Sequence, residues 1–381
     1  MYSYQPLKAD EVQYVLGRLD ERLADCPRGE RDPVFILKCL EERLADIAKE
    51  YEDDEAVFRD PDFGLDGLNR LGAILSSLSL IEDAYMPAVV HQTEEERTLR
   101  TIFIKSADRL GLEWIQDLVV YSSGSLAIFP SFLGSYGIPV IHVQVNFLDK
   151  CLSLPGVFHE LGHSVFLKFL EILTAMQKEV TEHFDSMRKG IGPVKETVKD
   201  KQIERLNEAQ QYWDEDRLAE LFCDVFAQYV SGCANIVSMI DLSMAEGQPA
   251  CKTDVEGYPP DAARVKVCEY ASTDEQLASV PVKDLLKNWE DYADIDNAPS
   301  FYRDVCHDKL LRRLSACIVK LISTLMPNTP KSVSVLPTFE EATAPFDTLT
   351  FEEAAQRAIA IQVFKPAMFD SWWREAQKKL I

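Results

Sequence analysis

The sequence lacks any long uninterrupted apolar run. No stretch approaches the ~18 consecutive apolar residues that a membrane-spanning helix requires. The N-terminal stretch also contains no apolar run resembling the central part of a secretory signal. We therefore expect a protein that neither inserts into a membrane nor carries an export signal.

The cysteines show neither a disulfide pattern nor a metal-binding pattern. There are nine of them, an odd number, scattered from Cys26 to Cys317 without a Cys-x-x-Cys pair. Such usage is typical of reduced thiols in a cytosolic compartment. It predicts a cytoplasmic protein and argues against a cysteine-based zinc site.

Basic residues are few in comparison with acidic ones. The chain has 40 Lys and Arg residues against 63 Asp and Glu residues, a formal net charge of −23. A surface this acidic repels phosphate groups, so nucleic acid and anionic membranes are excluded as expected partners. The alternative is that the acidic surface serves only solubility.

Apolar periodicity predicts a mostly helical chain with one small sheet. In residues 8–112, apolar residues recur at three- and four-residue spacing, which indicates helices. Residues 117–132 hold two short β-rich runs around Ser-Ser-Gly-Ser, a pattern that favours a hairpin, and residues 137–147 read as a third strand. Nearly everything from residue 156 onward is helical again. These patterns predict an α+β fold, mostly α-helical, with a small β-sheet next to the helix that begins near residue 156.

This pattern also suggests three regions along the chain. We expect an N-terminal helical region over residues 1–112, a central core over 113–272 and a C-terminal helical region over 273–381. Two loops rich in turn-forming residues interrupt the later helices, at residues 246–261 and 326–347.

One apolar helix carries an unusual cluster of polar residues. In "GVFHELGHSVF", residues 156–166, His159 and His163 are four residues apart and therefore lie on one helix face. Two imidazole nitrogens at this spacing can share one tetrahedral zinc ion, and Glu160 can act as a general base on the zinc-bound water. The alternative is a pair of hydrogen-bonded core histidines with a salt-bridged glutamate.

A second helix, at residues 216–230, offers the remaining groups of a zinc site. Its apolar stripe and its small residues predict burial on nearly all sides, yet Glu220 and Asp224 lie in it, four residues apart. We expect Glu220 to be the third zinc ligand. Asp224 is expected to accept the other ring N–H of a ligating histidine and so fix its tautomer. The alternative is an acidic pair on a solvated face.

Together these motifs resemble those of the gluzincin class of zinc metallopeptidases. A third stretch, "GYPPDAARV" at residues 257–265, is similar to the His-Pro-Pro-x-x-x-Arg element of the CAAX-prenyl-protease and heat-shock membrane peptidase family. Pro259, Pro260 and Arg264 match this element, whereas Tyr258 stands where that family has His. The resemblance implies a zincin-like core with Zn²⁺ and a peptide or protein substrate. Those relatives are embedded in membranes, so only the zinc chemistry is carried over.

The resulting hypothesis is a soluble zinc metallopeptidase. Glu160 would take a proton from the zinc-bound water and pass it to the leaving amine, and the substrate would lie along the strand near residues 138–147. Tyr258 would donate a hydrogen bond to the oxyanion, with His183 as the other candidate. Arg264 would orient Tyr258, clamp a substrate carbonyl or pair with Asp224.

Several alternatives stay open at this point. Tyr-Pro-Pro could simply cap a turn before the next helix. The whole chain could be a catalytically silent zincin-like module that binds a partner, or a zinc hydrolase acting on something other than peptides. His91, His142 and His307 are expected to be ordinary core or surface histidines. The sequence contains no pattern that sets the substrate identity or the oligomeric state.

Overall fold

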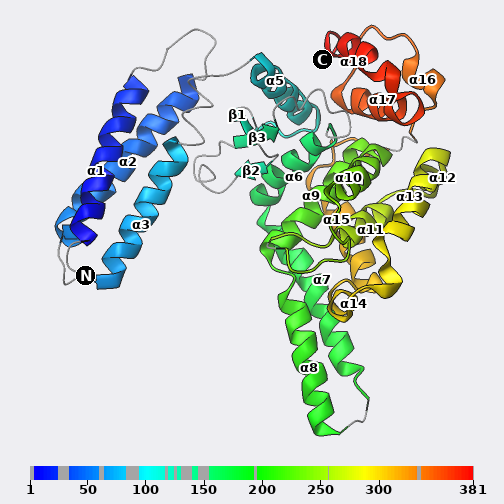
Figure 1. The fold of residues 1–381 in the computed structure, drawn as a ribbon, viewed down its shortest axis with the longest axis horizontal. Helices are drawn as coiled ribbons and strands as arrows, with labels where there is room; N and C mark the ends of the chain where they lie inside the picture. Colours follow the sequence, from blue (N-terminus) through cyan, green and yellow to red (C-terminus); the bar gives the residue numbers. More distant parts are fainter. Residues whose placement is uncertain are drawn as a thin grey trace. The chain divides into compact units, whose positions relative to one another are not determined.

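Helices make up most of this protein: 78% of the residues that the structure, a computed structural model, describes are helical (Figure 1). The structure describes residues 4–24, 34–59, 64–82, 94–115, 119–123, 127–129, 140–144, 154–192, 195–255, 257–332 and 336–380. The chain divides into two compact units. One unit comprises residues 1–101 and 114–145, and the other comprises residues 102–113 and 146–381.

The first unit contains three helices that all contact one another, α1 (Tyr4–Ala24), α2 (Val34–Arg59) and α3 (Gly64–Leu80). Leucine and isoleucine side chains bury the faces between them, and the buried Tyr51 hydroxyl donates a hydrogen bond to the carbonyl of Ala9. The same unit holds three short strands, β1 (Val119–Ser123), β2 (Ala127–Phe129) and β3 (Val140–Gln144). A further helix, α5 (Glu94–Arg109), begins in the first unit and ends in the second.

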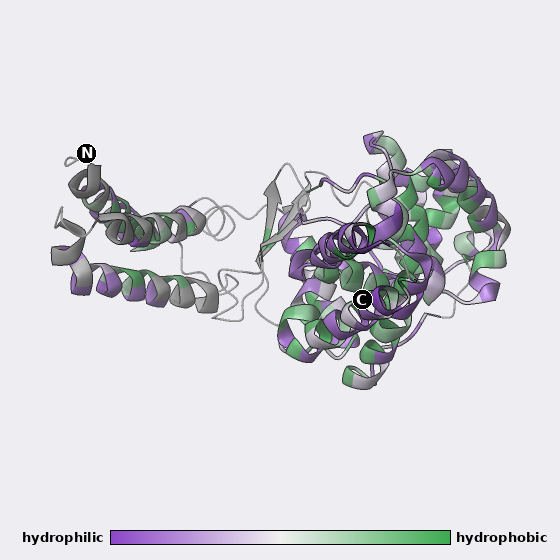
Figure 2. Ribbon diagram, turned by 90° about the horizontal axis from the view of Figure 1, so that it is seen from below, coloured by the Kyte–Doolittle hydropathy of each residue, from purple (hydrophilic) through white to green (hydrophobic). Residues whose placement is uncertain are grey.

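The second unit consists, in its described residues, of helices joined by loops, apart from one isolated β-bridge between Leu349 and Leu380. Its longer helices carry hydrophobic residues on one side and hydrophilic residues on the other (Figure 2). In chain order they are α6 (Gly156–Lys168), α7 (Leu170–Lys189), α8 (Glu196–Gln211), α9 (Glu215–Ser231), α10 (Cys233–Glu246), α11 (Asp261–Ala271), α12 (Asp274–Ala278), α13 (Val280–Ala293), α14 (Ser300–Val305), α15 (Asp308–Leu325), α16 (Phe339–Thr343), α17 (Phe351–Phe364) and α18 (Phe369–Gln377). Two short 3-10 turns, Ile295–Asn297 and Pro366–Met368, complete it.

Helix α9 lies at the centre of this unit. It contacts α6, α7, α10, α11, α15 and α17, and all of its residues from Glu220 to Ser231 are buried. Its first turn is capped by the Asp214 side chain, which accepts a hydrogen bond from the Arg217 backbone N–H. It ends at Gly232, whose positive φ of 60° suits glycine and turns the chain directly into α10. A helix surrounded in this way buries polar groups only where they have partners.

Helices α7 and α8 form an antiparallel pair that extends from the rest of the unit (Figure 1). The pair is attached through α14 and α15. The Trp213 ring N–H donates to the Val305 carbonyl over 2.9 Å, and Arg313 on α15 forms ion pairs with Glu179 and Glu182 on α7. These contacts hold α7 in place where it follows α6.

The α+β fold class predicted from the sequence is wrong. The fold is all-α in class, and the unit that holds the His-Glu-x-x-His helix has no sheet among its described residues. The three short strands belong to the other unit, so the expected zincin-like core with a sheet beside α6 is not what the chain forms. The physical reason is that α6 packs against the helices α9 and α7 and buries most of its apolar residues within this helical unit.

The strands also pair differently from the predicted hairpin. β1 runs parallel to β3 and β2 runs antiparallel to it, so that β3 lies between them. The boundaries of the two units differ from those of the three regions predicted from the sequence. The division into three regions stays a prediction. Among the described residues, none of the helices combines the length and the apolar character needed to cross a membrane.

Candidate metal centre

The site is built where α6 crosses α9 at very short range. Gly162 faces α9 at the crossing, and a Cβ atom placed on it would lie 3.0 Å from the Cα and 3.2 Å from the Sγ of Cys223. No larger residue fits this position without movement of one helix. The absence of a side chain at Gly162 therefore brings the backbones together, and with them the polar residues on either side of the crossing.

Three predicted ligands converge at this crossing. His159 Nε2 lies 3.3 Å from Glu220 Oε2, and His163 Nε2 lies 3.4 Å from Glu220 Oε1. Donors of one tetrahedral zinc ion, with bonds of about 2.0–2.2 Å, stand about 3.3–3.6 Å apart. Each imidazole Nε2 thus lies within this range of one oxygen of the Glu220 carboxylate. Two imidazole nitrogens and one carboxylate are also a donor set that zinc accepts.

Asp224 contacts the first histidine at the ring nitrogen that does not face Glu220. Its Oδ1 lies 3.0 Å from His159 Nδ1, and its side chain is almost fully buried. With this carboxylate at Nδ1, Nε2 is the ring nitrogen that faces the carboxylate of Glu220. This is the position predicted for Asp224 from the sequence, and its burial excludes the alternative of a solvated acidic pair.

Arg264 on α11 completes the polar cluster. Its Nε donates to Asp224 Oδ2 over 2.7 Å and its Nη2 to Asp224 Oδ1 over 2.8 Å, and Nη2 also lies 3.4 Å from Glu220 Oε2. Of the three roles considered for Arg264, the structure therefore shows the pairing with Asp224. A two-pronged pair of this kind fixes the carboxylate in a single orientation.

The carboxylates of Glu220 and Asp224 favour a positive charge on the His159 ring, which lies between them. Burial alone would lower the pKa of His159, but hydrogen bonds to Asp224 and Glu220 raise it to about 10. Burial and the neighbouring His159 cation lower the pKa of His163 to about 4. Glu220 and Asp224 thus favour positive charge at His159, which a proton or a bound metal cation could supply.

Glu160, the predicted base, is buried on α6 next to His159. Its negative charge contributes, after burial and other carboxylates, to the raised pKa values of Tyr258 and Cys223. The Glu160 carboxylate is therefore within electrostatic reach of residues on α9 and on the loop before α11.

Tyr258 lies on the loop that leads into α11, beside the cluster. Its side chain is 45% exposed, and the Arg264 guanidinium carbon is 5.8 Å from the centre of its ring. Burial and the charge of Glu220 raise the pKa of its hydroxyl. The Tyr212 hydroxyl donates to the Tyr258 carbonyl over 3.4 Å, and Arg217 donates to the Val255 carbonyl, so the start of α9 holds this loop.

The Tyr-Pro-Pro stretch also precedes a helix directly, because Pro260 is the N-cap of α11. The turn-capping alternative and the catalytic role of Tyr258 are therefore compatible with one another. The aromatic side chain is partly accessible to solvent, as a group that contacts substrate must be.

His183, the other candidate oxyanion donor, is found in a different environment. Its ring lies 5.2 Å from the His307 ring and against Phe184, where α7 meets the start of α15. His307 caps α15 by accepting the Lys309 backbone N–H. His142 lies on β3, and His91 is outside the described residues.

Cys223 is a residue of this site that the sequence analysis missed. Its Sγ and one ring nitrogen from each of His159 and His163 all lie within 4.8 Å of one another. Its thiol is completely buried, and burial holds its pKa well above the usual range. From the sequence, Cys223 counts only as one of the small residues that predict burial of this helix. The signal that could have found it is its spacing, three residues after Glu220 and hence on the same face.

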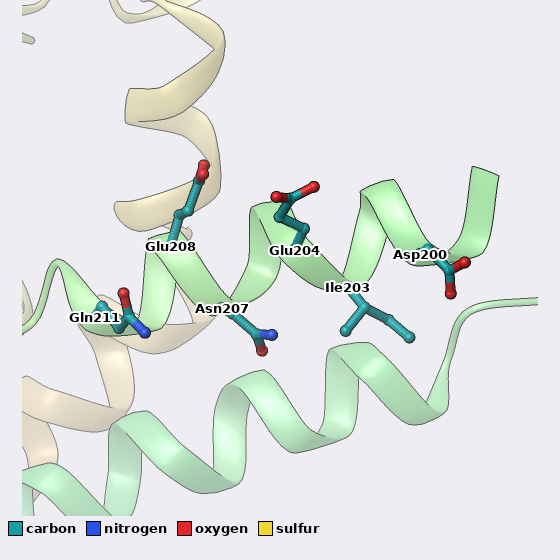
Figure 3. Close-up of a pocket in the computed structure, with 6 residues that line it drawn as sticks. All are labelled: Asp200, Ile203, Glu204, Asn207, Glu208 and Gln211. Carbon is teal, nitrogen blue, oxygen red and sulfur yellow. The ribbon is translucent and has the colours of Figure 1, made fainter. Parts of the chain in front are cut away.

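A groove elsewhere on this unit shares no residue with the metal centre. It runs along α8 and carries acidic and amide side chains around one isoleucine (Figure 3). Its lining residues are Asp200, Ile203, Glu204, Asn207, Glu208 and Gln211.

Comparisons with known protein families, with curated proteins and with solved structures found no match. The gluzincin resemblance of the motifs is therefore untested by any relative, and a function for this chain has to come from the geometry of the site alone.

Proposed function

We propose that this protein is a zinc-dependent metallopeptidase of the cytosol. The observation that carries the proposal is the spacing of three donors: two imidazole Nε2 atoms lie 3.3 and 3.4 Å from the oxygens of one buried carboxylate. His159, His163 and Glu220 would hold the ion, and Asp224 would orient His159 from behind. A bound zinc ion would supply a Lewis acid and a water molecule of lowered pKa.

The residues of the chain supply the remaining functions of a hydrolase. Glu160, adjacent to a ligand in sequence, would accept a proton from the attacking water and donate it to the leaving amine. Tyr258 would donate a hydrogen bond to the carbonyl oxygen as negative charge develops on it. Arg264 keeps Asp224 and Glu220 in place, so it acts as a positioning residue.

The substrate class and the compartment are parts of the same proposal. A general base beside a three-ligand metal site is the arrangement of a hydrolase, since a purely structural site requires no base. We therefore infer a peptide or protein as substrate. Reduced thiols support a cytosolic location: Cys223, Cys233, Cys251, Cys268, Cys306 and Cys317 are all free in the described part of the chain.

The first experiment measures metal content. We expect one zinc ion per chain after purification with zinc present, and loss of that ion in His159→Ala, His163→Ala and Glu220→Ala. Elemental analysis that finds no zinc in the wild type would remove the basis of the proposal.

The second experiment tests catalysis with a peptide library. Glu160→Gln should keep the zinc and the fold and should lose hydrolysis, because an amide cannot accept the proton. Glu171→Gln, an exposed acidic residue in the first turn of α7, is the matched control and should cleave like the wild type. Equal cleavage by Glu160→Gln and wild type would contradict the mechanism. A zinc-loaded wild type that cleaves no peptide would contradict the assignment to peptidases.

A further inference from the structure

The two histidines of the metal centre have a second potential partner on α9 besides Glu220. Cys223 follows Glu220 by three residues, so that both side chains project from the same face of the helix toward α6. The Cys223 sulfur lies 3.2 Å from where a Cβ on Gly162 would be, next to the backbone between the two histidines in the α6 sequence. The thiol thus faces the ligands rather than the surrounding apolar core.

The distances allow the sulfur to become a ligand. The Sγ atom and a ring nitrogen from each histidine all lie within 4.8 Å of one another. An ion bound at about 2.0 Å to nitrogen and about 2.3 Å to sulfur places these atoms about 3.5 Å apart. Side-chain movement on the order of 1 Å therefore suffices, with both helices staying in place.

We propose that His159, His163 and Cys223 form a binding site for a thiophilic metal ion, such as Cd²⁺ or Cu⁺, that overlaps the zinc site. Two imidazoles and one thiolate are a donor set that soft ions favour, whereas Glu220 offers oxygen, which they bind less well. The incoming ion replaces the proton of the thiol, and that proton passes to solvent. No oxidant or reductant takes part.

Binding of this kind would convert an open metal site into a closed one. With Glu220 as the third ligand, the fourth position is left for water, which a catalytic site requires. With His159, His163 and Cys223 holding the ion and Glu220 remaining as a fourth, weaker donor, protein atoms occupy all four positions and the water is displaced. A thiophilic ion would therefore inhibit the proposed peptidase. The inference shares two ligands with the proposed zinc centre and does not depend on what the protein hydrolyses.

The test uses Cd²⁺ as the probe, because a cadmium–thiolate bond gives a charge-transfer absorption band in the ultraviolet. We expect titration of the wild type to produce this band with the amplitude of one thiolate per chain, and Cys223→Ser to lose it. The matched control is Cys268→Ser. Cys268 is also free and completely buried and contacts the Asp224 carbonyl, but it belongs to α11. This variant should keep the band.

Two further variants distinguish this site from a thiolate elsewhere in the chain and from a folding defect. His159→Ala should lose the band even though Cys223 is intact, which ties the thiolate to the histidines. Cys223→Ala replaces Cys223→Ser if the hydroxyl prevents folding, and it should retain zinc while losing the cadmium band.

The outcomes separate this inference from the proposed function. A wild type that binds one zinc ion, and one Cd²⁺ without a thiolate band, would overturn the inference and leave the zinc centre intact. A band that disappears in Cys268→Ser and persists in Cys223→Ser would overturn it as well. A wild type that binds neither ion would overturn both.

Discussion

Replacing Gly162 by alanine should weaken metal binding by forcing α6 and α9 apart. The added Cβ would lie 3.0 Å from the Cα, 3.2 Å from the Sγ and 3.3 Å from the Cβ of Cys223. Carbon atoms in favourable contact are about 3.5–4.0 Å apart, so the atoms of Cys223 must give way by a few tenths of an ångström. Because two of the three contacted atoms are the Cα and Cβ of a central helix, rotation of a side chain cannot relieve the contact.

Two opposing terms set the effect on stability. Overpacking a tight contact costs about 1–3 kcal/mol. Alanine favours the helical state over glycine by up to ~1 kcal/mol. We expect a net loss of about 0–2 kcal/mol in the free energy of unfolding from these two terms. The effect on zinc should be larger, because metal–ligand distances tolerate deviations of only about 0.2 Å. An opening of a few tenths of an ångström already reaches this limit and displaces Glu220 from the histidines, so we expect zinc affinity to fall at least about tenfold.

Gly72→Ala is the matched control for this substitution. Gly72 lies within α3, and a Cβ there would meet nothing within 4 Å, so that variant gains helix propensity without a clash. Zinc affinity is measured by competition with a chelating dye, and the free energy of unfolding by urea titration. We expect Gly72→Ala to bind zinc like the wild type. If Gly162→Ala also binds zinc with unchanged affinity and is as stable as the wild type, the close crossing of α6 and α9 is refuted.

Three more predictions address single residues around the site and away from it. Asp224→Ala should lower zinc affinity by about 10–100-fold. It also removes the carboxylate that pairs with the buried Arg264 cation, so we expect the free energy of unfolding to fall by about 3–5 kcal/mol. Unchanged zinc affinity together with an unchanged urea midpoint would refute the role of Asp224 in orienting His159. Tyr258→Phe should keep its zinc and its thermal midpoint but lower kcat by roughly 10²–10³ with KM nearly unchanged, and a variant with full kcat would return attention to other donors. Burial and the charge of His307 lower the pKa of His183 from 6.5 to about 4. Between these two pH values the unfolded chain therefore binds more protons than the folded chain. The free energy of unfolding thus falls as the pH decreases from 6.5 to about 4. His183→Gln should reduce the pH dependence of the free energy of unfolding by up to about 1.4 kcal/mol per pH unit. If urea unfolding shows the same pH dependence for this variant and for the wild type, His183 is not the group responsible.

The helices and the motif residues could be predicted from the sequence because their signals are local. An apolar spacing of three or four residues specifies a helix and its buried face, whatever the helix later contacts. The same spacing places His159 and His163 on one face of α6, and Glu220 and Asp224 on one face of α9. The burial of α9 could also be predicted locally, because apolar and small residues occupy nearly all faces of the helix in its own sequence.

The class of the fold could not be predicted in this way, because strand pairing and the assignment of a sheet to a unit are not local. Alternation identified short β-rich runs but carried no information on which strand would lie beside which. A Gly-containing turn favoured β1 with β2, whereas β3 takes the central position between them. Nor could a sequence pattern show that α6 would pack mainly against α9.

The proposed donor residues could be identified from the sequence alone, whereas the way in which they meet depends on the packing of α6 against α9. Periodicity shows which face of a helix is apolar but not where two helices cross or how closely, and the long helical pair α7–α8 separates His163 from Glu220 along the chain. The crossing at Gly162 brings His163 Nε2 to 3.4 Å from Glu220 Oε1. It also places Cys223 beside the histidines. The position of α11 next to α9 directs Arg264 onto Asp224, one of the three roles that the sequence left open. These outcomes depend on distances between segments far apart in the chain, which side-chain packing sets and local patterns do not contain.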